Sequence, residues 1–186
     1  MPDDSTAATP GPQPPPLVMD PATGHMTLWG VPVWIIPPQY HAEMQAELEA
    51  LSGKAAKGML YRVAFRSGRR AVGALGLACD AGTPEAERSA RLRRFEEITL
   101  AAGHGISTVT VDDLARRELT MTMKHSLLAT MHPPSKEPVC HYYEGFLAGF
   151  VTAVLGMPVE GVETECRAKG DAQCSFRTRA VAHTPV

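Results

Sequence analysis

Residues 138–176 read PVCHYYEGFLAGFVTAVLGMPVEGVETECRAKGDAQCSF, and this stretch carries the pattern that decides the fold. Its apolar first part predicts a helix from about Val139 to Leu155, closed by a glycine and a proline. Two extended segments follow, 159–166 and 173–179, and the Gly170-Asp171 pair between them favours a turn. The stretch is therefore predicted to be a helix followed by an antiparallel hairpin.

Three cysteines and an acid of this stretch have the composition of a metal site. They are spaced C-x22-E-x2-C-x7-C and are Cys140, Glu163, Cys166 and Cys174. Three thiolates and one carboxylate complete a tetrahedral zinc site with no open position, which is typical of a metal that stabilises a fold. Cys140 begins the predicted helix, and a helix N-terminus favours the thiolate form that a metal requires.

The identity of the acid stays open on spacing alone. Glu163 and Cys166 are three residues apart, so a regular strand points them to opposite faces, and a bulge or a strand end near Cys166 is required. Glu165 is a competing ligand, and His141 and His132 are close in sequence. A disulfide and a set of simple buried thiols are the alternatives to a metal.

The register of the hairpin decides which cysteines are neighbours. A two-residue turn at Gly170-Asp171 pairs Arg167 with Cys174, whereas a three-residue loop at residues 169–171 pairs Cys166 with Cys174. Because only the second register places two thiols side by side on one face, a metal site favours it.

Composition indicates one globular domain with two tails. The 186 residues are 44% hydrophobic and carry a net charge of −2, so no overall field favours nucleic acid. Residues 1–16 are rich in proline and are expected to be disordered, residues 17–180 form the domain, and residues 181–186 form a C-terminal tail. The chain shows no basic, apolar signal peptide and no apolar run of about 18–20 residues, so a cytoplasmic protein is expected.

The rest of the sequence predicts an α+β fold in which an antiparallel sheet is packed with helices. The expected elements are a hairpin at 26–36, a helix at 40–51, an interrupted helix at 54–78, a helix from Thr83-Pro84 to about 103, and strands at 106–111 and 119–124. Cys79 is expected inside the interrupted helix. The alternating arginines and glutamates between Glu85 and Glu97 predict a solvated helix face.

On these residues the chain resembles the 4-vinyl reductase (4VR) domain family. The family pattern is a cysteine at a helix start, a Gly-x3-Gly helix, an E-x-x-C and a G-D-x-x-C-x-F. The matching residues here are Cys140, Gly145, Gly149, Glu163, Cys166, Gly170, Asp171, Cys174 and Phe176. A weaker similarity spans most of residues 20–180.

The resemblance implies a fold, a metal and an assembly. In the aromatic-sensing members of the family, structural zinc is held at the positions of Cys140, Glu163, Cys166 and Cys174, which favours Glu163 as the acid. The family is similar in fold to the trafficking-complex subunits, which pair with a second copy, so a homodimer is expected. Its members include sensor domains of aromatic-responsive activators and a vinyl reductase protein of bacteriochlorophyll biosynthesis.

A ligand pocket is expected beside the helix that Cys140 begins. The predicted ligand-binding residues are Phe146, Phe150, Tyr143 and Trp34, although core or dimer packing is the alternative for Trp34. Phe150 has no hydroxyl to orient a phenol, so phenol itself is not the expected ligand. The sequence contains no Walker A motif, so a sensing function requires a protein partner.

The function expected from the sequence is a zinc-containing protein that binds or senses a small hydrophobic or aromatic molecule and acts through a partner. One alternative is a tetrapyrrole-binding accessory or 8-vinyl reductase-like protein of (bacterio)chlorophyll biosynthesis. A second alternative is a structural dimerisation module. No catalytic residue is predicted, because the sequence carries no motif for a nicotinamide, a flavin or an activated nucleophile.

Overall fold

The computed structural model describes residues 17–181 and divides the chain into two compact units, Met1–Ile35 and Ile36–Val186. The predicted tails lie outside the described residues, except for Val181. The first unit holds a three-stranded antiparallel sheet in the order β1-β2-β3, with strands Leu17–Met19, Met26–Leu28 and Val31–Val33. Strands β2 and β3 confirm the predicted hairpin, whereas β1 was not predicted.

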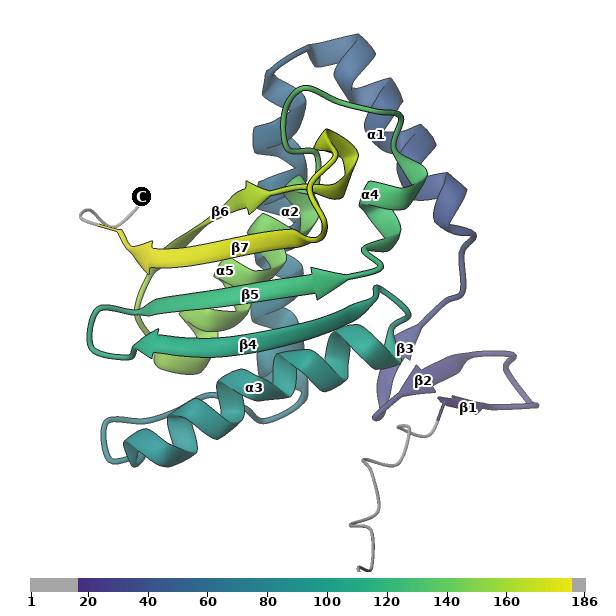
Figure 1. Ribbon diagram of the computed structural model, residues 1–186. Coiled ribbons are helices and arrows are strands. Elements are labelled where there is room, and N and C mark those ends of the chain that lie inside the picture. Colours follow the sequence, from purple (N-terminus) through teal and green to yellow (C-terminus); the bar gives the residue numbers. More distant parts are fainter. Residues whose placement is uncertain (1–16, 182–186) are drawn as a thin grey trace, which may run out of the picture. The chain divides into compact units, whose positions relative to one another are not determined.

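The second unit is α+β, as predicted, and is built on one antiparallel sheet. Its helices are α1 (Pro38–Ser52), α2 (Ala55–Ala74), α3 (Glu85–Ala101), α4 (Leu127–Met131) and α5 (His141–Leu155). Its strands are β4 (Ile106–Asp113), β5 (Glu118–Lys124), β6 (Val159–Glu165) and β7 (Cys174–Ala180). The strand order is β4-β5-β7-β6, so β6 is an edge strand. Figure 1 shows α3 running along β4, with α5 and then α2 behind the sheet.

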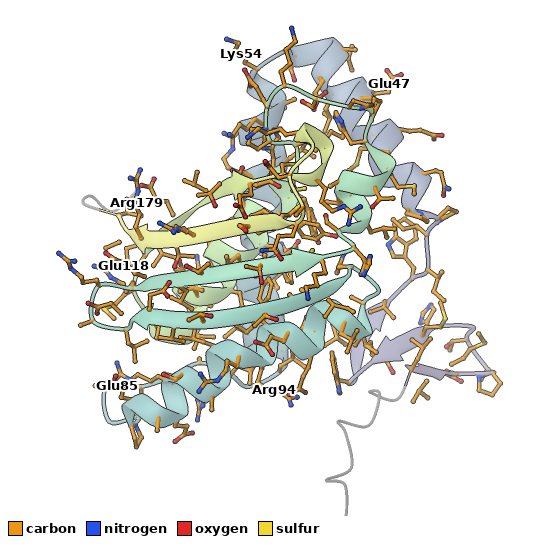
Figure 2. All side chains as sticks on the ribbon, viewed as in Figure 1. Glu47, Lys54, Glu85, Arg94, Glu118 and Arg179 are labelled. Atoms are coloured by element: carbon orange, nitrogen blue, oxygen red, sulfur yellow. The ribbon has the colours of Figure 1, made fainter. Side chains whose placement is uncertain are left out.

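The side chains of the sheet alternate as the sequence predicts. On β5, Leu119, Met121 and Met123 are buried, and the threonines between them lie on the other face. The strand thus contributes its apolar face to the core beneath α5. Charged residues lie on the outside, where labelled side chains such as Glu85, Glu118 and Arg179 point away from the core (Figure 2).

Helices α2 and α5 approach each other through glycines. A Cβ atom added at Gly145 or Gly149 of α5 would lie 2.1 or 2.0 Å from a carbonyl oxygen of α2. The same change at Gly68 of α2 would place the atom 2.2 Å from a carbonyl oxygen of α5. Because any side chain at these positions would clash with backbone, the three glycines set the distance between the two helices.

Three local predictions were wrong. Helix α2 is continuous, because its glycines serve close packing and exposed positions rather than breaks. Cys79 lies after α2, where its N–H bonds the carbonyl of Val154 at 2.9 Å. Helix α3 begins one residue late, with Pro84 as its N-cap, because the Thr83 hydroxyl bonds Asp80 instead.

No helix within residues 17–181 combines the length and the apolar character needed to cross a bilayer.

Candidate functional site

The fold brings the four predicted metal ligands together from three elements. Cys140 is the N-cap of α5, Glu163 lies on β6, Cys166 directly follows β6, and Cys174 begins β7. All four side chains are buried, and one ligand atom from each lies within 4.8 Å of the others. The sequence pattern therefore identified a real spatial cluster.

A bulge settles which acid belongs to the cluster. The β6–β7 pairing shifts between Glu163 and Glu165, which is the irregularity that the three-residue spacing required. Glu163 then points inward, while the carboxylate of Glu165 accepts a hydrogen bond from Ser175 on the adjoining strand. His141 bonds Glu144, and His132 Nδ1 lies 2.7 Å from the carbonyl oxygen of Pro133, so neither histidine joins the four.

The connection between β6 and β7 is longer than either predicted turn. A short 3-10 helix, η1 (Arg167–Lys169), follows Cys166, whose carbonyl accepts the N–H of Asp171 at 3.3 Å. In return the Asp171 carboxylate accepts the N–H of Cys166 at 2.7 Å. These bonds replace the backbone ladder that a tight turn would have continued, so both predicted turns were wrong.

The register that a metal site favours is nevertheless the one that the strands adopt. The last ladder pair before the loop is Glu165 with Ser175. One residue further along each strand, Cys166 and Cys174 lie opposite each other, as the second predicted register required. The two thiols therefore meet at the mouth of the loop.

The Glu163 carboxylate is held at one oxygen and unsatisfied at the other. Its Oε2 accepts the backbone N–H of Cys140 at 2.9 Å, whereas its Oε1 is buried without a partner among the described residues. Burial raises the pKa of Glu163 to about 8, and the neighbouring thiol of Cys166 contributes to the rise. The free oxygen faces a place where a cation would complete its coordination.

The three thiols have the spacing of zinc ligands. The Sγ atoms of Cys140 and Cys174 are 3.8 Å apart, and two sulfurs bound about 2.3 Å from a tetrahedral zinc are separated by about 3.8 Å. Hydrogen bonding among the thiols lowers the pKa of Cys166 and raises the pKa of Cys140. The group thus favours one thiolate by itself, and a divalent cation is the species that allows all three to ionise.

Glu144 supports the cluster from behind and was missed by the sequence analysis. Its Oε1 accepts the N–H of Glu163 at 2.8 Å, and its Oε2 lies 3.1 Å from Nδ1 of His141. Burial by itself raises the pKa of Glu144, but these two hydrogen bonds outweigh it and lower the pKa. The available signal was an acid placed one turn after Cys140 on an otherwise apolar helix.

An aromatic cluster continues from the cysteines along α5. Tyr143 and Phe150 are fully buried, and Phe146 is nearly so. The ring of Phe95 on α3 lies 5.1 Å from Phe150 and 5.5 Å from Phe146. The structure therefore brings three of the four predicted ligand residues to one side of α5. Trp34, the fourth, lies in the first unit.

Two histidines border the aromatic cluster, and the sequence analysis assigned them no role. His104 Nδ1 lies 3.1 Å from the Tyr143 hydroxyl, and His41 packs edge-on against Tyr142 with ring centroids 4.9 Å apart. Burial, aided by repulsion from His41, lowers the pKa of His104 to about 4. The cluster therefore offers an apolar surface with a neutral imidazole and a phenol as polar groups.

The largest pocket of the described residues lies on the opposite side of α5. It has a volume of about 1180 Å³ and is bounded by α2, α5 and β6. None of Tyr143, Phe146, Phe150 and Trp34 lines it.

Curated relatives match part of the chain. The uncharacterized protein MJ0150 of Methanocaldococcus jannaschii is 31% identical over 90 residues, which cover 48% of this chain and 51% of that protein. The uncharacterized protein MJ1642 of the same organism is 37% identical over 49 residues, covering 26% and 30%. The chain thus spans about half the length of the first relative and less than a third of the second.

Solved structures share the fold. The phenol-responsive sensory domain of the transcription activator PoxR, crystallised with phenol, aligns with a TM-score of 0.74 at 20% identity, covering 88% of this chain and 84% of that one. A vinyl-4-reductase family protein from Methanocaldococcus jannaschii aligns with a TM-score of 0.52 at 16% identity, covering 80% and 84%.

The family itself is identified by sequence. Residues 119–180, which begin on β5 and end on β7, match the vinyl-4-reductase (V-4-R) domain family. This segment contains all four residues of the buried Cys/Glu cluster and the whole of α5. The resemblance seen in the sequence is confirmed, and the chain belongs to the vinyl-4-reductase domain family.

Proposed function

We propose that this protein is a zinc-stapled sensory module that binds a small hydrophobic or aromatic molecule and passes the signal to a protein partner. The observation that carries the proposal is the arrangement along α5. Its N-cap, Cys140, belongs to the buried Cys/Glu cluster, and Tyr143, Phe146 and Phe150 follow on the next turns. A molecule that enters among these rings would move a helix anchored at one end.

Zinc is the metal that fits the donor set. Three thiolates and one carboxylate are soft and borderline ligands that zinc prefers, and four of them leave no position for a substrate. The unsatisfied Glu163 Oε1 and the 3.8 Å separation of two sulfurs support the same metal. When bound, zinc would neutralise the buried thiolates and tie the start of α5 to the β6–β7 loop.

A neutral aromatic molecule is the ligand that the adjoining cluster favours. The rings of Phe95, Phe146 and Phe150 offer offset and edge-on contacts of the kind that aromatic pairs prefer. The imidazole of His104 at the border of the cluster is neutral at pH 7 and attracts no anion. Trp34 stays a predicted contact, and the homodimer implied by the family resemblance is part of the proposal.

Metal analysis tests the staple. We expect about one zinc per chain by mass spectrometry of protein purified without chelator, and little zinc with a loss of cooperative unfolding in Cys174→Ser. Cys79→Ser is the matched control, because Cys79 lies outside the cluster and should leave both measurements unchanged. Less than about half an equivalent of zinc, together with a fully folded Cys174→Ser, would refute the staple.

Calorimetry and thermal unfolding with toluene and indole test the ligand. We expect these neutral aromatics to raise the unfolding midpoint by a few degrees, and the rise to shrink in Phe146→Leu. Phe65→Leu is the matched control, because Phe65 lies on α2 and lines the pocket on the other side of α5. If neither compound raises the midpoint, or if both variants respond like the parent protein, the proposed ligand site is wrong.

A further inference from the structure

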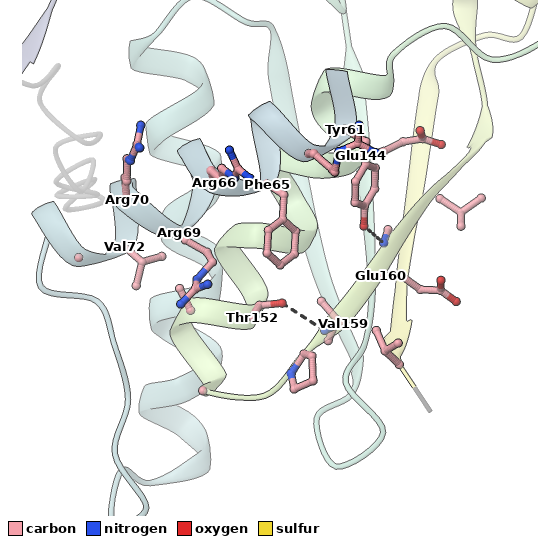
Figure 3. A pocket seen from close by; sticks show the side chains of 18 of the residues that line it. Tyr61, Phe65, Arg66, Arg69, Arg70, Val72, Glu144, Thr152, Val159 and Glu160 are labelled. Carbon is pink, nitrogen blue, oxygen red and sulfur yellow. Dashed lines mark hydrogen bonds between the residues drawn. The ribbon is translucent and has the colours of Figure 1, made fainter. Parts of the chain in front are cut away.

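The groove between α2, α5 and β6 has an apolar floor. Tyr61 and Phe65 of α2 stack at 6.3 Å and 19°, and Val159 and Val162 of β6 also line the groove. In Figure 3 the ring of Phe65 points into the space between α2 and β6. At about 1180 Å³ the groove is large enough for a drug-sized molecule.

One wall of the groove carries an unbalanced row of positive charge. Four exposed arginines of α2 line it, namely Arg62, Arg66, Arg69 and Arg70. Within residues 17–181 none of them has a carboxylate within 4 Å. The two acids of the groove are engaged elsewhere: Glu144 accepts from His141 and from the N–H of Glu163, and Glu160 pairs with Arg179.

This arrangement differs from that of an ordinary solvated helix. Helix α2 contains no Asp or Glu, and its arginines repeat at spacings of three and four residues, where like charges each cost a few tenths of a kcal/mol. Helix α3 pairs its arginines within the helix, Arg91 with Glu87 and Arg94 with Glu97. The charge on α2 therefore contributes nothing to the helix itself, and a bound anion would offset its repulsion.

A peptide strand is a poor occupant, although β6 is an edge strand. Two N–H groups of β6 beside the groove are already bonded to side chains. Val159 N–H donates to Thr152 at 3.1 Å, and Gly161 N–H donates to the Tyr61 hydroxyl at 3.1 Å, as the dashed lines of Figure 3 show. An added strand would have to break both bonds, so the edge is protected against strand addition.

We propose that this groove binds a small amphipathic carboxylate, with its apolar body on Tyr61, Phe65 and the β6 valines and its carboxylate at the α2 arginines. The guanidinium fork matches a carboxylate in two parallel hydrogen bonds, and an apolar rim lowers the competition from water. Arg69 is the leading contact, because it reaches toward α5 beside Thr152, whereas Arg66 and Arg70 extend outward (Figure 3). The site is distinct from the aromatic cluster and does not depend on it.

Calorimetry with decanoate tests the site in the full-length, metal-replete protein. We expect decanoate to bind at one site per chain, about tenfold more weakly in Arg69→Gln than in the parent protein, and decanol and acetate not to compete. Arg93→Gln is the control, because Arg93 is exposed on α3 and its loss changes the net charge equally. Phe146→Leu should also bind decanoate normally, which separates this site from the one for neutral aromatics.

Three outcomes would overturn the proposal. Equal affinities in Arg69→Gln and Arg93→Gln would show that only overall charge matters. Decanol binding as tightly as decanoate would show that the arginines do not hold the head. Binding to phosphatidylglycerol vesicles without binding to decanoate would make the arginine row a membrane-facing surface instead.

Discussion

Helix α5 has two faces that pack by opposite rules. The face toward α3 and the sheet carries large side chains, Tyr143, Phe146 and Phe150, and fills its space with rings. The face toward α2 is reduced to Gly145 and Gly149, so that backbone meets backbone. One helix therefore combines a core built from volume with a contact built from the absence of side chains.

The difference explains where each proposed ligand belongs. On the aromatic face a molecule must share space with rings that are already in contact, so only a small, apolar compound is expected there. On the other face α2 lies close to α5 yet remains apart from β6, and this separation leaves the open groove. The two sites lie back to back on α5, and changes in one face can be made without touching the other.

Removal of volume should be most harmful on the aromatic face. Phe150→Ala removes a fully buried ring that contacts Phe95, and we expect a loss of about 3–5 kcal/mol in the free energy of unfolding. Phe65→Ala, on the groove side, should cost clearly less because Phe65 is partly exposed. Urea unfolding measures both, and equal losses would mean that the two sides of α5 are packed alike.

Addition of volume should be harmful on the glycine face. Gly149→Ala places a Cβ only 2.0 Å from a carbonyl oxygen of α2, so the helices must separate at a cost of about 1–3 kcal/mol. Gly73→Ala is the control, because a Cβ there meets nothing within 4 Å, and a gain of about 0.5–1 kcal/mol is expected. Urea unfolding again gives both values, and a neutral Gly149→Ala would show that the close approach of α2 and α5 is not what holds them together.

The candidate metal site was largely predictable, because its information is local. The cysteine spacing and the acid identify the donors, and the three-residue offset of Glu163 and Cys166 already required the bulge that the structure contains. The loop was not predictable, because its path depends on a side chain, Asp171, that replaces the backbone partner of a tight turn. A family resemblance helped where spacing left Glu163 and Glu165 as equals.

The packing of α2 was not predictable from its own sequence. Glycines at positions 58, 68, 73 and 76 look like breaks until the partner helix is known, and only Gly68 faces a helix backbone. The arginine row likewise becomes a wall of a groove only once β6 is placed beside it. The signal that was present in the sequence, and went unused, is the absence of any acid between residues 55 and 74.

The polar edge of the aromatic face should respond to pH, with the smallest effect of the three. The pKa of His104 is lowered to about 4, from an ordinary value near 6.5, by burial and by His41 of α1. The unfolded chain therefore binds a proton at this residue before the folded chain does. Stability should be complete above about pH 6.5 and should fall as the pH drops toward 4, by at most about 1.4 kcal/mol per pH unit.

The variant His104→Gln isolates this contribution, because glutamine keeps a polar group near the Tyr143 hydroxyl but does not titrate. Urea unfolding at several pH values should show the parent protein losing stability relative to His104→Gln between pH 6.5 and 4. The loss of metal-binding thiolates at acid pH affects both proteins equally and cancels in the difference. A constant difference across that range would mean that His104 titrates alike in the folded and unfolded chains, and that the cluster around Tyr143 is as open to water as the groove behind it.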